Sequence, residues 1–347
     1  MGGGSGSAMQ LVAFFTLVTV QSGAILLFKL AQIGGGYSFS PASSVCLTEM
    51  VKFTIAFGSH ALEVRRTGDD WFPDLSWPII GHYFGLSILY TINNILTFYV
   101  LEEADPGTLS LFKSIAPYLC AMLLRLTGQK LNRLQWSCVV IQCCAIAIIQ
   151  YDVTKGVPLL KPVAYVMLTM ATSITAVSSV WNQLVLKGFS VPLNLQNAIL
   201  YTFGMLTSII CFWVGPSKSI KGFFEGYNML GVALILFQAL HGLAVSFVYK
   251  HADAIIKNFA NSSVMAVLVC VSAFFFGLQM NVHSALAVVI IVVTTYIYMS
   301  IAIHMKEPAH EEYETRENVG LVGSIDATSE DENSYDLRPT KGMQSGR

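Results

Sequence analysis

Long runs of hydrophobic residues recur along the chain, and short polar stretches separate them. Each run reaches about 20 residues, the length that a helix needs to cross a hydrocarbon core of roughly 30 Å. None shows the alternation of hydrophobic and polar residues that is typical of membrane-spanning strands. The pattern predicts an all-α, polytopic membrane protein with ten transmembrane helices, at residues 9–32, 40–63, 77–101, 107–127, 133–151, 162–186, 194–215, 227–249, 257–279 and 282–305.

The composition supports this interpretation and sets one segment apart. Hydrophobic residues make up 54% of the 347 residues and charged residues 12%, about half the charged fraction of a typical soluble protein. Residues 306–347 contain ten acidic and five basic residues and no hydrophobic run, which predicts a disordered acidic tail. The rest of the chain then has 15 Lys and Arg against 11 Asp and Glu. The membrane part is therefore expected to carry a surplus of positive charge.

The basic residues of the loops predict the orientation in the membrane. Ten spans place both termini on one side, and the loops on that side carry more lysine and arginine than the opposite loops. Because cytosolic loops are enriched in these residues, both termini, and with them the acidic tail, are expected in the cytosol. The basic residues on this side are Arg65, Arg66, Lys130, Arg133, Lys187, Lys250 and Lys306, against Lys155, Lys161, Lys218 and Lys221 on the other.

A weak internal repeat divides the membrane part into two halves. The segment GQKLN begins at Gly128, between the fourth and fifth spans, and GLQMN begins at Gly277, between the ninth and tenth. Halves of five helices have an odd helix count, so the second half must enter the membrane in the opposite orientation. We therefore expect a short N-terminal tail at residues 1–8 and two inverted five-helix repeats at residues 9–151 and 152–305, with a site at their interface.

Charged residues inside the predicted spans indicate an anionic ligand. Lys113 lies in the fourth span without a carboxylate three or four residues away, and Lys257 begins the ninth span. A charged side chain at this depth costs at least about 2.5 kcal/mol, so it usually marks a ligand or a partner. The alternative is that Lys113 snorkels to the lipid headgroups. Glu49 and Lys52 lie three residues apart in the second span, where they can neutralise each other, and this pair fits a packing role and a binding role equally well.

Amides and tyrosines form a second group of candidate binding residues. Tyr90, Asn93 and Asn94 lie at mid-depth in the third span, and Asn197 and Tyr201 lie four residues apart in the seventh. Such residues either join helices by hydrogen bonds worth about 0.6 kcal/mol each, or they stack on and hydrogen-bond a base or a sugar. Both interpretations stay open at this point.

The sequence shows no motif of an enzyme. It contains no phosphate-binding P-loop, no GxSxG or HExxH motif and no cluster of cysteines and histidines. The seven cysteines and the isolated His82 and His241 are predicted to pack inside the helix bundle. We therefore expect no enzymatic activity, no cofactor and no metal site.

A resemblance to a known family runs through five stretches of the chain, FSPASSVCLTEMVKF, YTINNILTFYVLEEADPGT, GQKLNRLQW, PLNLQNAILYTFG and HGLAVSFVYKHADAIIKNF. In this order they are similar to the nucleotide-sugar transporters of the UDP-galactose and CMP-sialic acid type, which belong to the drug/metabolite transporter superfamily. The resemblance implies ten helices in inverted repeats. It also implies exchange of a cytosolic nucleotide sugar for a nucleoside monophosphate from the lumen of the Golgi apparatus or endoplasmic reticulum.

The resemblance implies roles for individual residues as well. Family motifs in helices two, three, seven and nine match Thr48, Glu49, Lys52, Tyr90, Asn93 or Asn94, Asn197, Tyr201, Lys250, Asp253 and Lys257. In the family, the residues at the Asn197 and Tyr201 positions contact the nucleotide. The chain departs from the family pattern where the usual fourth-helix lysine falls on Ala116. Lys113 lies one turn earlier on the same face, so we expect it to be a phosphate ligand displaced by that turn. It departs again where the usual sixth-helix glutamate is Gln183, and these departures argue against CMP-sialic acid as the substrate.

The sequence therefore predicts a divergent nucleotide-sugar transporter of the Golgi membrane. It would exchange a cytosolic nucleotide sugar, with a UDP-sugar as the first candidate, for a luminal nucleoside monophosphate. One alternative is a membrane scaffold that keeps the transporter fold without transport. Another is a carrier of CMP-sialic acid or of a CDP-linked alditol. The expected partners are these nucleotides and the lipid bilayer, without nucleic acid, and a homodimer is left open.

Overall fold

A computed structural model describes residues 3–34, 36–73, 75–104, 109, 112–113, 115–128, 131–150, 161–215, 220–276 and 282–304. The contacts within the chain define two compact units, residues 1–299 and residues 300–347. In the second unit the described residues are 300–304, which continue the last helix. The predicted acidic tail at 306–347 lies outside the described residues.

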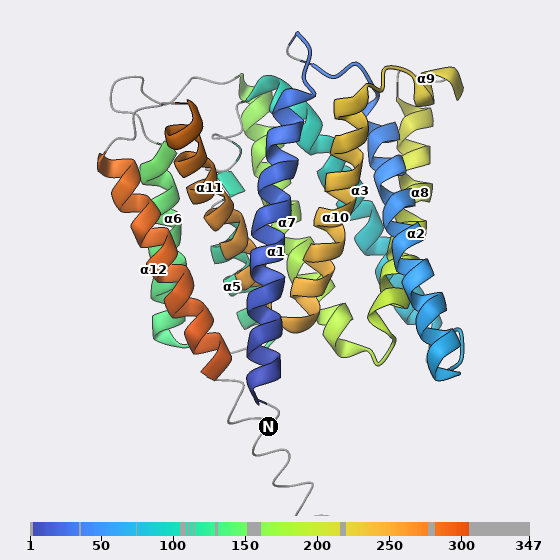
Figure 1. Cartoon of the computed structure of the whole chain (residues 1–347), viewed down its shortest axis with the longest axis horizontal. Helices are drawn as coiled ribbons and strands as arrows, with labels where there is room; N and C mark the ends of the chain where they lie inside the picture. Colours follow the sequence, from blue (N-terminus) through green and yellow to red (C-terminus); the bar gives the residue numbers. More distant parts are fainter. Residues whose placement is uncertain are drawn as a thin grey trace, which may run out of the picture. The chain divides into compact units, whose positions relative to one another are not determined.

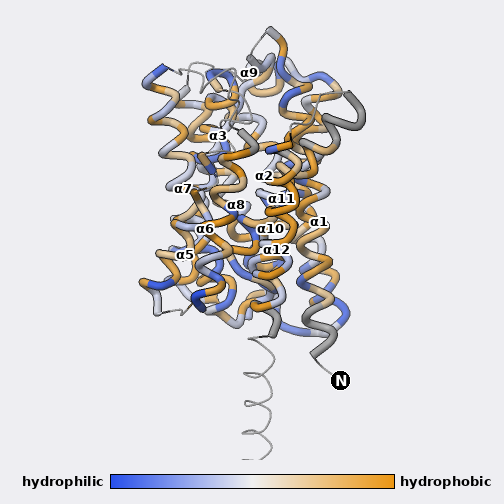
Figure 2. Tube along the Cα trace, turned by 90° about the vertical axis from the view of Figure 1, so that its left-hand side faces the viewer, coloured by the Kyte–Doolittle hydropathy of each residue, from blue (hydrophilic) through white to orange (hydrophobic). Residues whose placement is uncertain are grey.

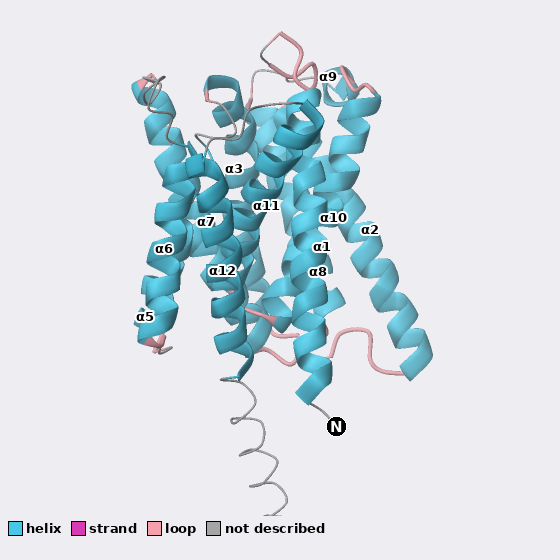
Figure 3. Ribbon diagram, turned by 60° about the vertical axis from the view of Figure 1, so that its left-hand side comes forward, coloured by secondary structure: helices cyan, strands magenta, loops and turns pink. Residues whose placement is uncertain are grey.

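The described residues form eleven helices and no strand, and only an isolated bridge joins Ile33 and Gly36 (Figure 3). The helices are α1 (Gly3–Leu30), α2 (Pro41–Thr67), α3 (Trp77–Glu103), α5 (Ala116–Leu126), α6 (Arg133–Gln150), α7 (Pro162–Gly188), α8 (Leu193–Val214), α9 (Ile220–Phe224), α10 (Met229–His251), α11 (Ala254–Phe276) and α12 (Val282–His304) (Figure 1). All of them except α9 fall on predicted spans, so the all-α prediction is confirmed. In the region of the fourth span, residues 109, 112 and 113 are helical and α5 follows, and the predicted start at 107 lies outside the described residues.

Within the described residues, five helices are long and apolar enough to cross a membrane. They are Ala8–Leu30, Trp77–Glu103, Pro162–Gly188, Leu193–Val214 and Met229–His251. Four shorter apolar helices accompany them, at Ala116–Leu126, Arg133–Ile148, Ala254–Leu268 and Ala285–Ile301. Hydrophilic segments gather toward the two ends of the bundle and hydrophobic ones dominate between them (Figure 2). The chain is thus a membrane protein with several spanning helices, and the count of ten stays a prediction.

The ends of α2 illustrate how the sequence sets the helix boundaries. Pro41 occupies the first turn, where its missing N–H is not needed. Gly68 ends the helix in the left-handed conformation, with φ of 78°, and its N–H donates to the Val64 carbonyl oxygen. Arg65 and Arg66 in the last turn complement the helix dipole. Local sequence therefore fixes where α2 starts and stops.

Helices of the first half of the chain pack mainly against helices of the second half. The largest contacts pair α2 with α8 and α1 with α10, and Figure 1 shows α10 beside α1. Further pairs are α3 with α8, α3 with α7, α1 with α11, α2 with α10 and α5 with α7. One buried cluster joins α2, α3, α7 and α8 through residues that include Ala56, Tyr83, Val185 and Leu195. Polar side chains that face inward from these helices are consequently brought together between the two halves.

Candidate substrate cavity

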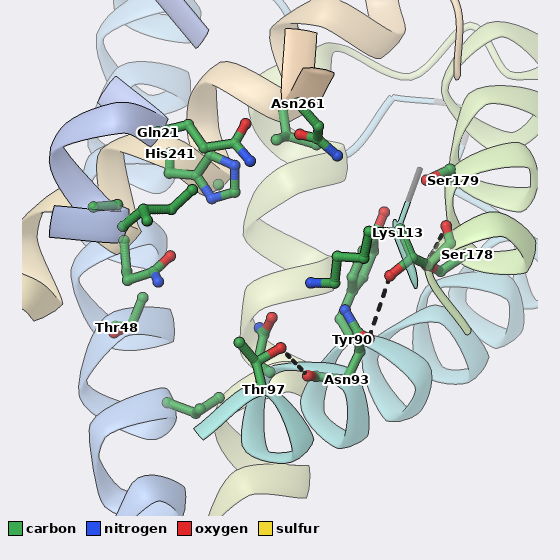
Figure 4. A pocket seen from close by; sticks show the side chains of 18 of the residues that line it. Gln21, Thr48, Tyr90, Asn93, Thr97, Lys113, Ser178, Ser179, His241 and Asn261 are labelled. Atoms are coloured by element: carbon green, nitrogen blue, oxygen red, sulfur yellow. Dashed lines mark hydrogen bonds between the residues drawn. The ribbon is translucent and has the colours of Figure 1, made fainter. Parts of the chain in front are cut away.

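A cavity between the two halves is lined by residues of α1, α2, α3, α7, α8, α10 and α11, with contributions from Leu109, Lys113 and Ile146 (Figure 4). Of the residues predicted to bind ligand, eight line it: Glu49, Lys52, Tyr90, Asn93, Asn94, Lys113, Tyr201 and Lys257. Asn197 does not, although it is buried in α8. Thr48 lines the cavity as well, whereas Lys250 and Asp253 do not.

The described lining residues carry more positive than negative charge. Four lysines, Lys29, Lys52, Lys113 and Lys257, face a single carboxylate, that of Glu49. Lys52 and Glu49 form an ion pair of 2.5 Å and are only 7% and 4% exposed, so they neutralise each other inside the protein. Lys29 is exposed, and its Nζ donates to Gln32 Oε1 at 3.1 Å.

Lys113 and Lys257, together with the exposed Lys29, supply the remaining positive charge. Both residues line the same cavity, and Lys257 is 9% exposed. Among the described lining residues only Glu49 is acidic, and its carboxylate is already paired with Lys52. Figure 4 shows the Lys113 side chain projecting into the cavity, from the side of Tyr90 toward the side of His241. Two cations of this kind favour an anion between them.

The Glu49–Lys52 pair fits into space left by two glycines. A Cβ atom on Gly204 of α8 would lie 2.9 Å from Glu49 Oε2, and one on Gly242 of α10 would lie 2.7 Å from Lys52 Cδ. Lys52 Nζ also lies 4.4 Å from the centre of the Tyr201 ring, a cation–π contact. The pair therefore joins α2 to both α8 and α10 at the cavity wall.

The predicted third-helix residues make hydrogen bonds to α7. Asn182 Nδ2 donates to the Tyr90 hydroxyl at 2.9 Å, and Thr175 Oγ1 donates to Asn93 Oδ1 at 3.4 Å. Asn94 lines the cavity beside them. The interhelical and the ligand-binding interpretations of these residues are thus compatible. The side chains of Tyr90 and Asn93 hydrogen-bond to α7, and they also line the cavity in which a ligand would bind.

Tyr201 and Asn197 lie on the same helix but differ in position. The Tyr201 hydroxyl is 3.3 Å from Ser246 Oγ, and the residue is 2% exposed at the cavity wall. Asn197, one turn earlier, is 4% exposed and lies outside the lining. Only one of the two predicted seventh-helix residues is therefore in place to contact a ligand in the cavity.

The two departures from the family pattern have structural explanations. Ala116 is fully buried at the start of α5 and does not line the cavity, whereas Lys113 does. Gln183 Oε1 accepts a hydrogen bond of 2.6 Å from the Ala254 N–H, the first residue of α11. Asp253 Oδ1 accepts from the Ile256 N–H at 2.7 Å in the same turn. Gln183 thus fixes the start of the helix that carries Lys257, outside the cavity itself.

Sequence reasoning missed most of the other polar residues of the lining, and four of them have a buried polar atom without a hydrogen-bond partner among the described residues. These four come from four helices and are Gln21, Asn182, His241 and Asn261. His241, which was predicted to pack inside the bundle, lines the cavity. His82 does pack, and its Nδ1 accepts from Trp181 Nε1 at 3.2 Å. In the sequence, each histidine is a lone polar residue in a hydrophobic run. The sequence therefore gives no signal that distinguishes the histidine at the cavity from the one that packs against a neighbouring helix.

Three comparisons place the chain among known proteins. The model of a family described as nucleotide-sugar transporter matches residues 5–299. The protein named CMP-sialic acid transporter 2 of Oryza sativa subsp. indica is 27% identical over 267 residues, covering 75% of this chain and 73% of that protein. The protein named probable UDP-sugar transporter protein SLC35A4 of Xenopus tropicalis is 28% identical over 293 residues, covering 81% and 89%. A crystal structure with 16% identity, covering 86% of this chain and 99% of its own, superposes with a TM-score of 0.62 and so shares the fold.

Proposed function

Because the chain belongs to the nucleotide-sugar transporter family, we propose that it exchanges a cytosolic nucleotide sugar for a luminal nucleoside monophosphate across the Golgi membrane. A UDP-sugar is the first candidate. The named relatives comprise a CMP-sialic acid transporter and a probable UDP-sugar transporter, both at under 30% identity. CMP-sialic acid is therefore the second candidate, and the base and sugar are to be found by experiment.

The observation that carries the proposal is the charge of the cavity. Lys113 and Lys257 face a space whose only described acidic lining residue is already paired. Phosphate groups are strong acceptors of charge-assisted hydrogen bonds from lysine. Tyr90 and Tyr201 line the same space, and the half-buried Tyr90 offers a ring on which a base can stack. Anion, base and amide contacts are thus available in one cavity.

The packing of the helices supports a transport mechanism based on inverted repeats. If the second half repeats the first, α7, α8, α10, α11 and α12 correspond to α1, α2, α3, α5 and α6. Each contact between the halves should then have a counterpart with the roles of the halves exchanged. The counterpart of the contact α1–α10 is α7–α3, that of α1–α11 is α7–α5, and that of α2–α10 is α8–α3. All six of these pairs are in contact. Ten spans in two inverted halves, with residues 9–151 opposite residues 152–305, would let the halves rock around a central site.

The same charges give a reason for exchange rather than one-way transport. An empty carrier that closes around the cavity must bury Lys113 and Lys257 without a partner, which is costly in a membrane. A bound nucleotide sugar or nucleoside monophosphate pairs with both ammonium groups and removes that cost. The carrier should therefore cross between its two states mainly when it is loaded, in either direction.

Transport into vesicles tests the proposal directly. Purified protein is reconstituted into liposomes, with or without internal UMP or CMP, and uptake of UDP-galactose or CMP-sialic acid is measured. Preloaded vesicles should take up the matching nucleotide sugar many times faster than empty ones. If the wild-type protein binds and exchanges no nucleotide, the alternative of a scaffold without transport is favoured.

Variants of Lys113 test the role of the cavity charge. Lys113→Met removes one charge-assisted hydrogen bond worth about 1.5–3 kcal/mol, so the nucleotide Kd should rise roughly ten- to hundredfold. Lys161→Met is the matched control, because the Lys161 side chain is 73% exposed, pairs with Glu103 at 2.7 Å and does not line the cavity. Normal affinity and exchange in Lys113→Met would mean that this lysine snorkels and binds no phosphate.

A further inference from the structure

Four buried atoms on the cavity wall have no hydrogen-bond partner among the described residues. They are Gln21 Oε1, Asn182 Oδ1, His241 Nε2 and Asn261 Oδ1. The three amide oxygens can only accept hydrogen bonds, and Nε2 of a neutral imidazole accepts when the proton sits on Nδ1. The cavity therefore presents a set of acceptors, in addition to its ammonium groups, and needs donors from whatever fills it.

The direction of the Asn261 amide follows from its neighbours. Asn258 Nδ2 donates to the Ala254 carbonyl oxygen at 2.8 Å and to Cys120 Sγ at 3.2 Å, which leaves Asn258 Oδ1 as an acceptor. Asn261 Nδ2 donates to that oxygen at 3.4 Å. The nitrogen of Asn261 is thus engaged within α11, and its oxygen is the free end of the side chain.

The four acceptors lie in two places. Asn182 belongs to the side of Tyr90, whose hydroxyl it contacts. Gln21, His241 and Asn261 come from α1, α10 and α11, and Figure 4 shows them across the cavity from Tyr90, with Lys113 projecting between the two sides. These three residues are called the acceptor cluster below.

We propose that the acceptor cluster is a sugar-binding subsite, in which Gln21, His241 and Asn261 accept hydrogen bonds from hydroxyl groups of the sugar of a nucleotide sugar. The proposal rests on the proposed function and specifies the part of the substrate that this side of the cavity binds. The phosphates contact Lys113 and Lys257 in the middle, and the nucleoside lies on the side of Tyr90 and Asn182.

Hydrogen-bond chemistry separates the sugar from the phosphates. The ribose hydroxyls and the base also donate, but in the proposed arrangement they lie with the nucleoside on the side of Tyr90 and Asn182. An ionised phosphate offers acceptors only, so it satisfies the lysines and none of the acceptor cluster. Sugar hydroxyls donate, and a site built to bind hydroxyls discriminates strongly against ligands that lack them, because buried acceptors are then left unpaired. A nucleoside monophosphate has no sugar beyond its phosphate, and with it the cluster must be satisfied by water. The two exchanged ligands should therefore differ in how much they depend on the cluster.

The ratio of the affinities for the nucleotide sugar and for the nucleoside monophosphate tests whether the acceptor cluster binds the sugar. The Kd values for UDP-galactose and UMP, or for CMP-sialic acid and CMP if the wild-type protein prefers cytidine nucleotides, are measured with purified full-length protein. Gln21→Leu and Asn261→Leu should each raise the nucleotide-sugar Kd roughly three- to tenfold, the effect of one neutral hydrogen bond, and leave the monophosphate Kd within twofold. The matched control is Gln10→Leu, since Gln10 lies on the same helix as Gln21, also has a buried oxygen without a partner, and does not line the cavity.

Substrate analogues keep the test independent of variant stability. A UDP-galactose analogue with one sugar hydroxyl replaced by fluorine, which accepts but does not donate, should bind the wild-type protein three- to tenfold more weakly at the contacted hydroxyl. The same analogue should lose little further affinity in the variant whose acceptor that hydroxyl contacts. If all variants and analogues keep the wild-type ratio of the two Kd values, the subsite is refuted while the transport function stands. If wild-type protein binds neither nucleotide, the proposed function fails and the subsite with it.

Discussion

Removing the carboxylate of Glu49 should destabilise the protein strongly. Glu49→Gln keeps the size of the side chain and removes its charge, so Lys52 stays buried without its ion-pair partner. Breaking a buried pair in this way costs about 3–5 kcal/mol, because one charge is left uncompensated. At about 2 °C per kcal/mol for a chain of this size, the melting temperature should fall by at least roughly 6 °C.

An exposed ion pair of the same chemistry provides the comparison. Lys161 and Glu103 are 2.7 Å apart, with side chains that are 73% and 39% exposed. Such a pair contributes about 0.2–1 kcal/mol, so Glu103→Gln should change the melting temperature by no more than about 2 °C. Both variants are measured by thermal unfolding of purified protein in the same detergent.

A double variant separates charge from packing. Glu49→Leu combined with Lys52→Met removes both charges and keeps most of the volume, and replacements of this kind are often neutral or stabilising. The double variant should therefore melt above Glu49→Gln. Adding a nucleoside monophosphate should also stabilise Glu49→Gln more than wild type, since the anion can pair with the released Lys52. If Glu49→Gln and Glu103→Gln shift the melting temperature equally, the pair is not the buried, uncompensated contact that the structure indicates.

Three further outcomes are expected. Tyr201→Ala should weaken monophosphate binding roughly tenfold, because it removes an aromatic ring of the cavity wall, on which Lys52 packs. Asn197→Ala should leave the Kd within twofold, because Asn197 does not line the cavity. Equal losses of affinity in isothermal titration would indicate that both residues contact the ligand. Gly242→Ala should lower the melting temperature, since its Cβ would lie 2.7 Å from Lys52 Cδ, while Gly58→Ala, with nothing within 4 Å, should not. Protease added to sealed Golgi vesicles should remove an epitope placed at the C-terminus, and protection would reverse the cytosolic assignment of both termini.

The helices could be predicted closely because hydrophobic runs of membrane length are a strong and local signal. Ten of the described helices lie on predicted spans. α9 was missed because its five residues, Ile220–Phe224, are too short to form such a run. Length and hydropathy therefore predict the long spans and do not detect a short helix between them.

Residues of the cavity could be predicted only where the prediction did not require knowing which face of a helix points inward. Lys113 and Lys257 are unusual in any orientation, because a charge in a hydrophobic run is costly wherever it points. Asn197 and Tyr201 are four residues apart, which at 3.6 residues per turn rotates them by only about 40°, yet only Tyr201 lines the cavity. Gln21 and His241 posed the same problem. Whether a lone polar residue faces a cavity or a neighbouring helix is decided by packing between distant segments.

The arrangement of charges sets a condition on which ligands can be exchanged. With Glu49 and Lys52 cancelling each other, Lys113 and Lys257 line the cavity without a carboxylate partner among the described residues. A nucleoside monophosphate carries about −1.5 to −2 at pH 7. The diphosphate of a UDP-sugar, or the phosphate and carboxylate of CMP-sialic acid, likewise supplies two negative charges. Under the proposed exchange, either ligand would neutralise the same pair of lysines, so one cavity could close around both at similar cost. A ligand with a third negative charge would leave one charge unpaired, and the Glu49→Gln variant, with one more free cation, should accept it better than the wild-type protein does.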